Sequence, residues 1–73
     1  MVYYTNVQTT AQLLGISVQT IYSWSRRGKM FFHVDSRVGY LIPLSDIAMK
    51  LGISERDLLK QMYRKGQPVW GCE

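Results

Sequence analysis

The sequence Leu-Gly-Ile-Ser occurs twice in this short chain, at residues 14–17 and again at residues 51–54. Each copy follows an alanine placed three residues before its leucine, and each leads into a segment that ends in basic residues and glycine. Glycine suits the left-handed backbone conformation that ends many helices, and serine is a good N-cap for the helix that follows. Each copy therefore predicts a helix, a tight turn anchored by isoleucine, and a second helix.

The first copy joins two segments that both carry helical signals. Residues 5–8, Thr-Asn-Val-Gln, fit a capping box in which Thr5 caps a helix over about residues 6–14. Apolar residues recur through this segment at helical spacing. The second helix should run from about Val18 to Arg27 and stop at Gly28. Two helices joined in this way form a helix-turn-helix, whose second helix is placed for the major groove of DNA.

The segment that follows has the pattern of a β-hairpin. Residues 29–34 are short and aromatic, which favours a strand, and residues 35–39 are rich in turn-forming side chains. Residues 40–42 can return as the partner strand, which Pro43 would end. A two-stranded hairpin directly after a helix-turn-helix is a wing.

Two further helices complete the predicted fold, over residues 44–51 and about Glu55–Arg64, on either side of the second Leu-Gly-Ile-Ser. The predicted fold class is therefore mainly α with a small β-hairpin (α+β), a winged helix-turn-helix of about four helices. The length allows one small domain. We assign this DNA-binding domain to residues 1–66 and expect residues 67–73 to form a C-terminal tail.

The distribution of charge favours a polyanionic partner. The net charge is +4, and residues 1–34 contain no aspartate or glutamate although they include Arg26, Arg27 and Lys29. Phosphate contacts dominate the non-specific binding of proteins to nucleic acids, so an acid-free half with a basic cluster suits DNA. The alternative is a basic surface that serves solubility alone.

The second helix of the first copy presents a face suited to reading bases. At 100° per residue, Ile21 and Trp24 share the side assigned to the core, and the opposite side carries Gln19, Tyr22, Ser23 and Arg26. Glutamine can bind adenine and arginine can bind guanine through paired hydrogen bonds, so this side has the chemistry for base readout. Tyr22 has an alternative role, which is to pack over the wing.

The second copy differs from the first in the chemistry of the equivalent face, which carries Arg56, Leu59, Lys60 and Tyr63. Its first turn contains Glu55 and Asp57, which stabilise the helix dipole but would repel phosphate. Its apolar arc is also wider. We therefore expect the first copy to read DNA and the second mainly to pack.

Several stretches carry a resemblance to a known family. Tyr4-Thr5, residues 11–21 (Ala-Gln-Leu-Leu-Gly-Ile-Ser-Val-Gln-Thr-Ile) and Gly28-Lys29-Met30 resemble the DNA-binding end of MerR-type regulators. Residues 37–43 (Arg-Val-Gly-Tyr-Leu-Ile-Pro), followed by a helix, are similar to small phage and transposon excisionases, which share that winged fold. The resemblance covers about residues 4–51. It implies a recognition helix in the major groove and a wing that touches the DNA backbone or the minor groove.

Carried over by position, the resemblance implies helix contacts from Ser17, Gln19, Thr20, Tyr22, Ser23 and Arg26, and a wing contact from Arg37. The basic cluster at the end of the helix adds two more residues to this set, Arg27 and Lys29. The long dimerisation helix and the effector domain of full-length MerR regulators are absent from the sequence, so no small-molecule effector is expected.

These observations predict a sequence-specific double-stranded DNA-binding protein, a small phage or mobile-element transcription regulator or excisionase. One alternative is a DNA-binding adaptor of a larger machine, of the terminase small subunit or replication type. Another is a protein-interaction module that uses the winged fold. Self-association on DNA through the C-terminal segment is expected, with Tyr63, Val69 and Trp70 available, although Trp70 can instead fold onto the core.

Catalysis, metal binding and membrane insertion find no support in the sequence. It has no paired carboxylates, no His-containing triad and no phosphate-binding glycine loop, so we expect neither enzyme activity nor a cofactor. His33 has no second histidine or cysteine nearby for a metal and is expected to be a packed histidine. No apolar run approaches the ~20 residues that span a bilayer. The expected location is the cytoplasm, in association with the nucleoid.

Overall fold

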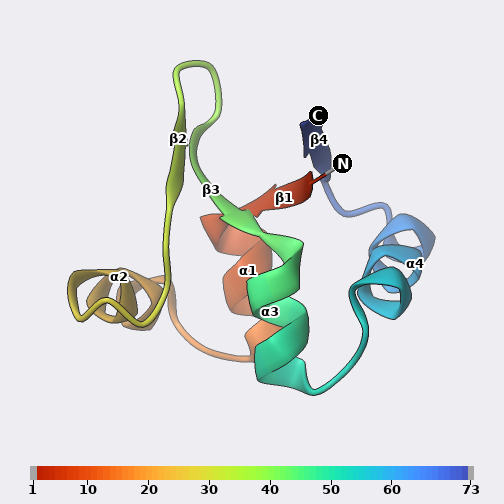
Figure 1. Cartoon of the computed structure of the whole chain (residues 1–73), viewed down its shortest axis with the longest axis horizontal. Coiled ribbons are helices and arrows are strands. Elements are labelled where there is room, and N and C mark those ends of the chain that lie inside the picture. The colour runs from red at the N-terminus through yellow and green to blue at the C-terminus, as the bar shows by residue number, and fades with distance from the viewer. Residues whose placement is uncertain (1, 73) are drawn as a thin grey trace.

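The computed structural model describes residues 2–72 and contains four helices and a four-stranded antiparallel sheet (Figure 1). The elements follow one another in the order β1 (Val2–Asn6), α1 (Val7–Leu14), α2 (Val18–Arg26), β2 (His33–Asp35), β3 (Gly39–Pro43), α3 (Leu44–Leu51), α4 (Glu55–Lys65) and β4 (Trp70–Cys72). The strand order in the sheet is β2-β3-β1-β4. The predicted fold class, an α+β winged helix-turn-helix of about four helices, is confirmed, and the small predicted hairpin is part of this larger sheet.

The two Leu-Gly-Ile-Ser turns have the same backbone geometry. Gly15 and Gly52 end α1 and α3 with φ values of 69° and 71°, in the left-handed region that favours glycine. In each turn the N–H of the following isoleucine donates to the carbonyl of the preceding alanine at 3.1 Å. Ser17 and Ser54 then cap α2 and α4, and each hydroxyl accepts the N–H of the residue three positions on at 3.1 Å.

The start of α1 differs from the predicted capping box. Asn6, and not Thr5, is the N-cap, because the Asn6 Oδ1 accepts the N–H of Thr9 at 2.7 Å. Thr5 belongs to β1, where its side chain is fully buried. Its hydroxyl donates to the carbonyl of Pro68 at 2.7 Å and is therefore engaged with the segment before β4.

The sheet contains two strands that the sequence did not predict, β1 and β4. β1 lies in the middle, where Thr5 is paired with Ile42 of β3 on one side and Tyr3 with Gly71 of β4 on the other. The segment 67–73, predicted to be a tail, includes the edge strand β4, and residue 73 lies outside the described residues. The predicted wing is present, since β2 pairs with β3, although β2 begins later than the expected residue 29.

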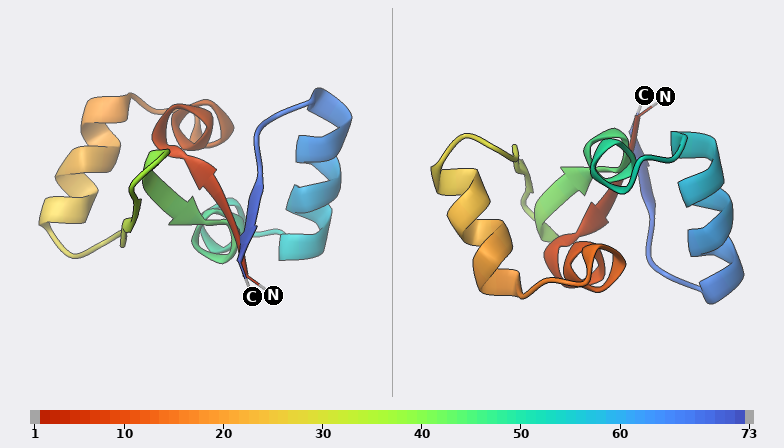
Figure 2. Two further views of the ribbon diagram at one scale, coloured as in Figure 1. Left: turned by 90° about the horizontal axis from the view of Figure 1, so that it is seen from above. Right: turned by 90° about the horizontal axis from the view of Figure 1, so that it is seen from below.

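The register of the sheet relates the two halves of the chain by an approximate half-turn. One half is β1-α1-α2-β2 and the other is β3-α3-α4-β4, and the Thr5–Ile42 pair lies at the centre. The pairing of β2 with β3 has the same register as the pairing of β4 with β1. His33 faces Leu41 in the first pairing, and Trp70 faces Tyr4 at the equivalent position of the second. Figure 2 looks along this axis and shows α2 and α4 on opposite sides, with α1 and α3 between them. The repeated four-residue turn therefore belongs to an internal structural repeat.

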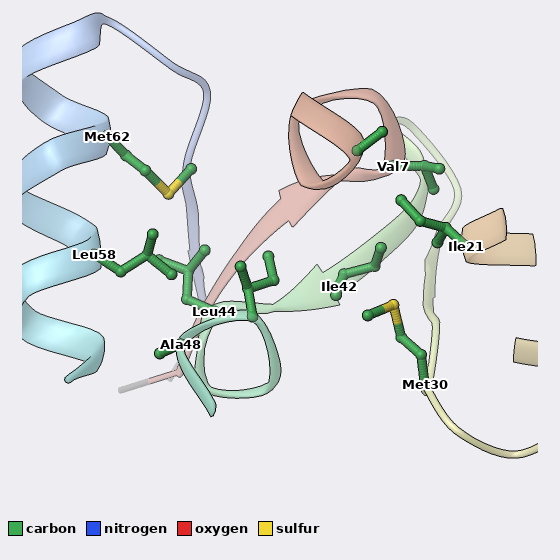
Figure 3. Close-up of a cluster of buried hydrophobic side chains, with 10 residues drawn as sticks. Val7, Ile21, Met30, Ile42, Leu44, Ala48, Leu58 and Met62 are labelled. Carbon is green, nitrogen blue, oxygen red and sulfur yellow. The ribbon is translucent and has the colours of Figure 1, made fainter. Parts of the chain in front are cut away.

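Both halves contribute to a single hydrophobic core. Ile21 points into it from α2, and Leu58 and Met62 point into it from α4 (Figure 3). The remaining buried hydrophobic residues of this cluster are Val7, Ala11, Met30, Ile42, Leu44, Ile47 and Ala48. The two alanines that precede the Leu-Gly-Ile-Ser turns are among them, which lets α1 and α3 approach the rest of the core closely. Trp24, expected in the core, is partly buried and packs against it.

Candidate nucleic-acid interface

The outward face of α2 is the first component of the candidate interface. Gln19 and Arg26 are exposed on it and Ser23 is half-buried, while Ile21 on the opposite face is fully buried. The helical arrangement predicted for these residues is thus present. Neither α2 nor the residues next to it carry a carboxylate, so nothing on this face repels phosphate.

The N-terminus of α2 holds two more residues of the predicted set. The Ser17 hydroxyl accepts the N–H of Thr20 at 3.1 Å and lies 2.9 Å from the Thr20 hydroxyl. Both side chains therefore stabilise the start of the helix. Ser17 is exposed and Thr20 is half-buried, so their hydroxyl groups lie at the edge of the outward face.

Tyr22 connects α2 to the wing. Its ring lies edge-on to Phe32, with ring centroids 5.5 Å apart, and edge-on to Tyr40 of β3 at 6.1 Å. Phe32 and Tyr40 also contact each other, with centroids 5.1 Å apart. Of the two roles considered for Tyr22, packing over the wing is the one seen, yet 38% of its surface remains exposed. This aromatic cluster of Tyr22, Phe32 and Tyr40 fixes the wing relative to α2.

The cluster borders a shallow hollow between α2 and the wing, with a volume of about 500 Å³. Arg26 reaches this hollow from the helix, and Phe31 and Val34 reach it from the wing side. Phe31 and Val34 are largely exposed, with 74% and 68% of their surfaces accessible. Sequence reasoning missed these two residues; the signal was the aromatic and apolar content of residues 29–34.

The turn at the tip of the wing is held by Asp35. The Asp35 Oδ1 accepts the N–H of Arg37 at 2.8 Å and the N–H of Val38 at 3.1 Å. These two hydrogen bonds hold the pKa of Asp35 below its usual value because they favour the ionised carboxylate, and the bond from Arg37 has the larger effect. The wing turn is therefore supported at neutral pH, and the exposed Arg37 is placed at its tip.

The other basic residues are distributed differently. Arg27 is the C-cap of α2 and is exposed. Lys29 lines a separate hollow with Trp24 and Lys50. The Lys50 Nζ lies 5.3 Å from the centroid of the Trp24 ring and donates to the Lys29 carbonyl at 3.4 Å. The structure thus brings Tyr22, Arg26 and the wing together, and it places Lys29 outside the hollow between them.

A comparison with protein families matches residues 6–49 to the family described as "Helix-turn-helix domain", which is more than half of the chain. The chain belongs to this helix-turn-helix family. It is a DNA-binding helix-turn-helix protein, and such domains are typically not enzymes. The matched segment of this helix-turn-helix protein begins at the N-cap of α1 and ends within α3, so it contains α2 and the wing. Searches of curated proteins and of solved structures found no match.

Residues 2–72 of this helix-turn-helix protein contain no cluster of three or more metal-ligating side chains. His33, expected to be packed within an apolar strand, is instead exposed, because it lies on the edge strand β2. Its ring stacks on Tyr4 of β1 with centroids 5.1 Å apart. Within the same residues, every helix is too short or too polar to cross a bilayer.

Proposed function

We propose that this helix-turn-helix protein binds a specific double-stranded DNA site and acts as a transcription regulator or excisionase of a phage or another mobile element. The observation that carries the proposal is the outward face of α2. Gln19 and Arg26 are exposed there on a helix with no acidic side chain, and Tyr22 of that helix packs against Tyr40 of the wing. Glutamine and arginine are the side chains that read adenine and guanine in the major groove.

The proposed contacts divide into two groups. Gln19, Ser23 and Arg26 would contact base edges, and Tyr22 would lie beside them at the hollow next to the wing. Phosphate contacts would come from both ends of α2 and from the wing tip, through Ser17, Thr20, Arg27, Lys29 and Arg37. Phosphate contacts position the protein and base contacts specify the sequence, so the two groups have different effects when they are substituted.

Self-association on DNA through the C-terminal segment stays a prediction. Tyr63 is largely exposed and available for such a contact, whereas Val69 packs against the core and Trp70 is half-buried in β4. A contact between neighbouring molecules would therefore use Tyr63 and the free edge of β4. Association with the nucleoid is proposed on the same basis as DNA binding.

The first test is to identify the bound DNA and measure how substitutions weaken binding. Genomic fragments captured by the protein and then footprinted would define the site. Gln19→Ala and Arg26→Ala should each weaken binding to that site by about 1–3 kcal/mol if they contact bases. Gln12→Ala, on the exposed side of α1, is the matched control and should leave binding unchanged.

Salt dependence separates DNA binding from a protein-interaction role. The logarithm of the affinity should fall with the logarithm of the salt concentration, with a slope of about −0.9 for each neutralised phosphate. Lys29→Ala should lower the magnitude of this slope by about 0.9, the contribution of one phosphate contact, and should weaken binding to all sequences equally. Binding that is weak and insensitive to salt would remove the proposed function.

A further inference from the structure

In the second half of the chain, α4 occupies the place that α2 occupies in the first half. Each follows a Leu-Gly-Ile-Ser turn and is capped by the serine of that turn. Each also leads to a short strand that pairs with the first strand of the other half, and the two pairings have equivalent registers, Val34 with Tyr40 and Gly71 with Tyr3. The helix that reads DNA in the proposed function therefore has a structural counterpart in the same molecule.

The outward face of α4 is strongly basic. Arg56, Lys60 and Arg64 recur every four residues along it, Lys65 follows, and all four side chains are exposed. The two acidic residues of α4, Glu55 and Asp57, lie in its first turn, and no carboxylate follows them within the helix. The last two turns of α4 thus present positive charge alone, together with the exposed ring of Tyr63.

The outward faces of α2 and α4 point away from each other. Ile21 of α2 and the two buried residues of α4, Leu58 and Met62, enter the same core from opposite sides (Figure 3). The two helices lie at opposite ends of the molecule (Figures 1 and 2), whose Cα atoms extend over 30 × 27 × 18 Å. DNA is stiff over about 150 base pairs, so one short straight duplex cannot contact both outward faces.

We propose that α4 is a second DNA-binding surface, which holds the phosphate backbone of a second duplex segment while α2 holds the specific site. One molecule would then join two DNA segments. The inference rests on the proposed function of α2. Lysine and arginine at regular spacing on an exposed helix suit phosphates, and the equivalence with α2 favours DNA over an acidic protein as the partner.

The test is a bridging assay with the whole chain. Protein is bound at low density to an immobilised duplex that contains the specific site, and a fluorescent duplex of unrelated sequence is then added. The wild-type protein should retain the second duplex, with retention that falls as salt rises. The Lys60→Ala/Arg64→Ala variant should still bind the first duplex with unchanged affinity. Its retention of the second should weaken about tenfold for each lost phosphate contact at about 0.1 M salt.

Two controls make the outcomes distinct. Gln61→Ala changes an exposed, uncharged residue of the same helix and should retain both duplexes. Arg26→Ala should bind the immobilised site about 5- to 150-fold more weakly, and unchanged binding would count against α2 and the proposed function. Wild-type protein that holds the first duplex but never the second would overturn the second surface alone. The second surface would also be overturned if the double variant retained the second duplex or if retention did not depend on salt. Binding of α4 to an acidic protein instead of DNA would overturn it as well.

Discussion

Gly15 and Gly52 show how closely the two halves agree at the scale of single residues. Their φ values are 69° and 71°, and at either glycine no atom beyond the adjoining residues of the chain lies within 4 Å of the position that a Cβ would occupy. A methyl group would therefore meet no neighbour. The cost of a side chain at these positions comes from the left-handed backbone conformation alone.

Alanine at either glycine should therefore destabilise the protein by a similar amount. Gly15→Ala and Gly52→Ala are each expected to lower the free energy of unfolding by about 1–2 kcal/mol, the penalty for an L-residue in the left-handed region. Urea denaturation should show a lower midpoint with an unchanged m value. Gln12→Ala, in the exposed part of α1, should show no loss. A clear difference between the two glycine variants would show that the two turns are not equivalent.

At the scale of elements, the position of the wing depends on a contact between α2 and the hairpin. Tyr22 is the residue of α2 whose ring contacts both Phe32 and Tyr40. Aromatic pairs contribute about 0.5–1.5 kcal/mol each beyond the area that they bury. Tyr22 therefore helps to set the orientation of the wing relative to the outward face of α2, alongside the pairing of β3 with β1.

Two substitutions of Tyr22 separate packing from DNA contact. Tyr22→Ala should lower the free energy of unfolding by about 1–3 kcal/mol, because two aromatic contacts are lost. Tyr22→Phe keeps the ring and should leave stability unchanged, as measured by denaturation. If the phenylalanine variant also binds DNA with full affinity, the hydroxyl makes no contact with DNA. A stable alanine variant would contradict the packing role.

The helices were predictable from the sequence because their signals are local. The residues 44–51 predicted for the third helix are those of α3, and the glycine and serine of each turn mark the neighbouring helix ends. The strands β1 and β4 were not predictable in this way. Each exists because a distant partner supplies its hydrogen bonds, so Thr5 was interpreted as a cap and residues 67–73 as a tail.

The same distinction between local and long-range signals applies to the candidate site. The outward face of α2 follows from helical spacing, since the burial of Ile21 fixes which side faces solvent. The aromatic cluster of Tyr22, Phe32 and Tyr40 does not, because it depends on how the hairpin folds back over the helix. The clustering of charge in the sequence did not predict the position of Lys29, which is close to Arg27 in sequence but borders a different hollow from the one that Arg26 lines.

At the scale of the whole molecule, the ends of the described chain lie next to each other. Val2 and Cys72 are Cα partners in the pairing of β1 with β4. A short linker could join them without moving either strand, and the chain could then be opened at the wing turn, residues 36–38, which is exposed. Exposed turns are the sites where such circular permutation is tolerated.

The permutant joined in this way and opened at residues 36–38 should fold, with a free energy of unfolding within about 1 kcal/mol of the original chain. Circular dichroism and thermal unfolding would measure this. A permutant opened between Ile47 and Ala48, inside α3, should fail to fold, since both residues are buried there. Failure of the first permutant would show that the wing turn is needed for folding as well as for its proposed contact with DNA.

The strand order also determines when the protein can acquire its structure during synthesis on the ribosome. The two strands of the first half, β1 and β2, do not pair with each other; β2 pairs with β3, and β1 pairs with β3 and β4. A nascent chain that has emerged only as far as β2 therefore has no sheet to form. At about 5–20 residues per second, several seconds pass between the appearance of β1 and that of its last partner. During that interval the backbone of β1 is open to pairing with other chains, so this segment is where a chaperone would have most to protect.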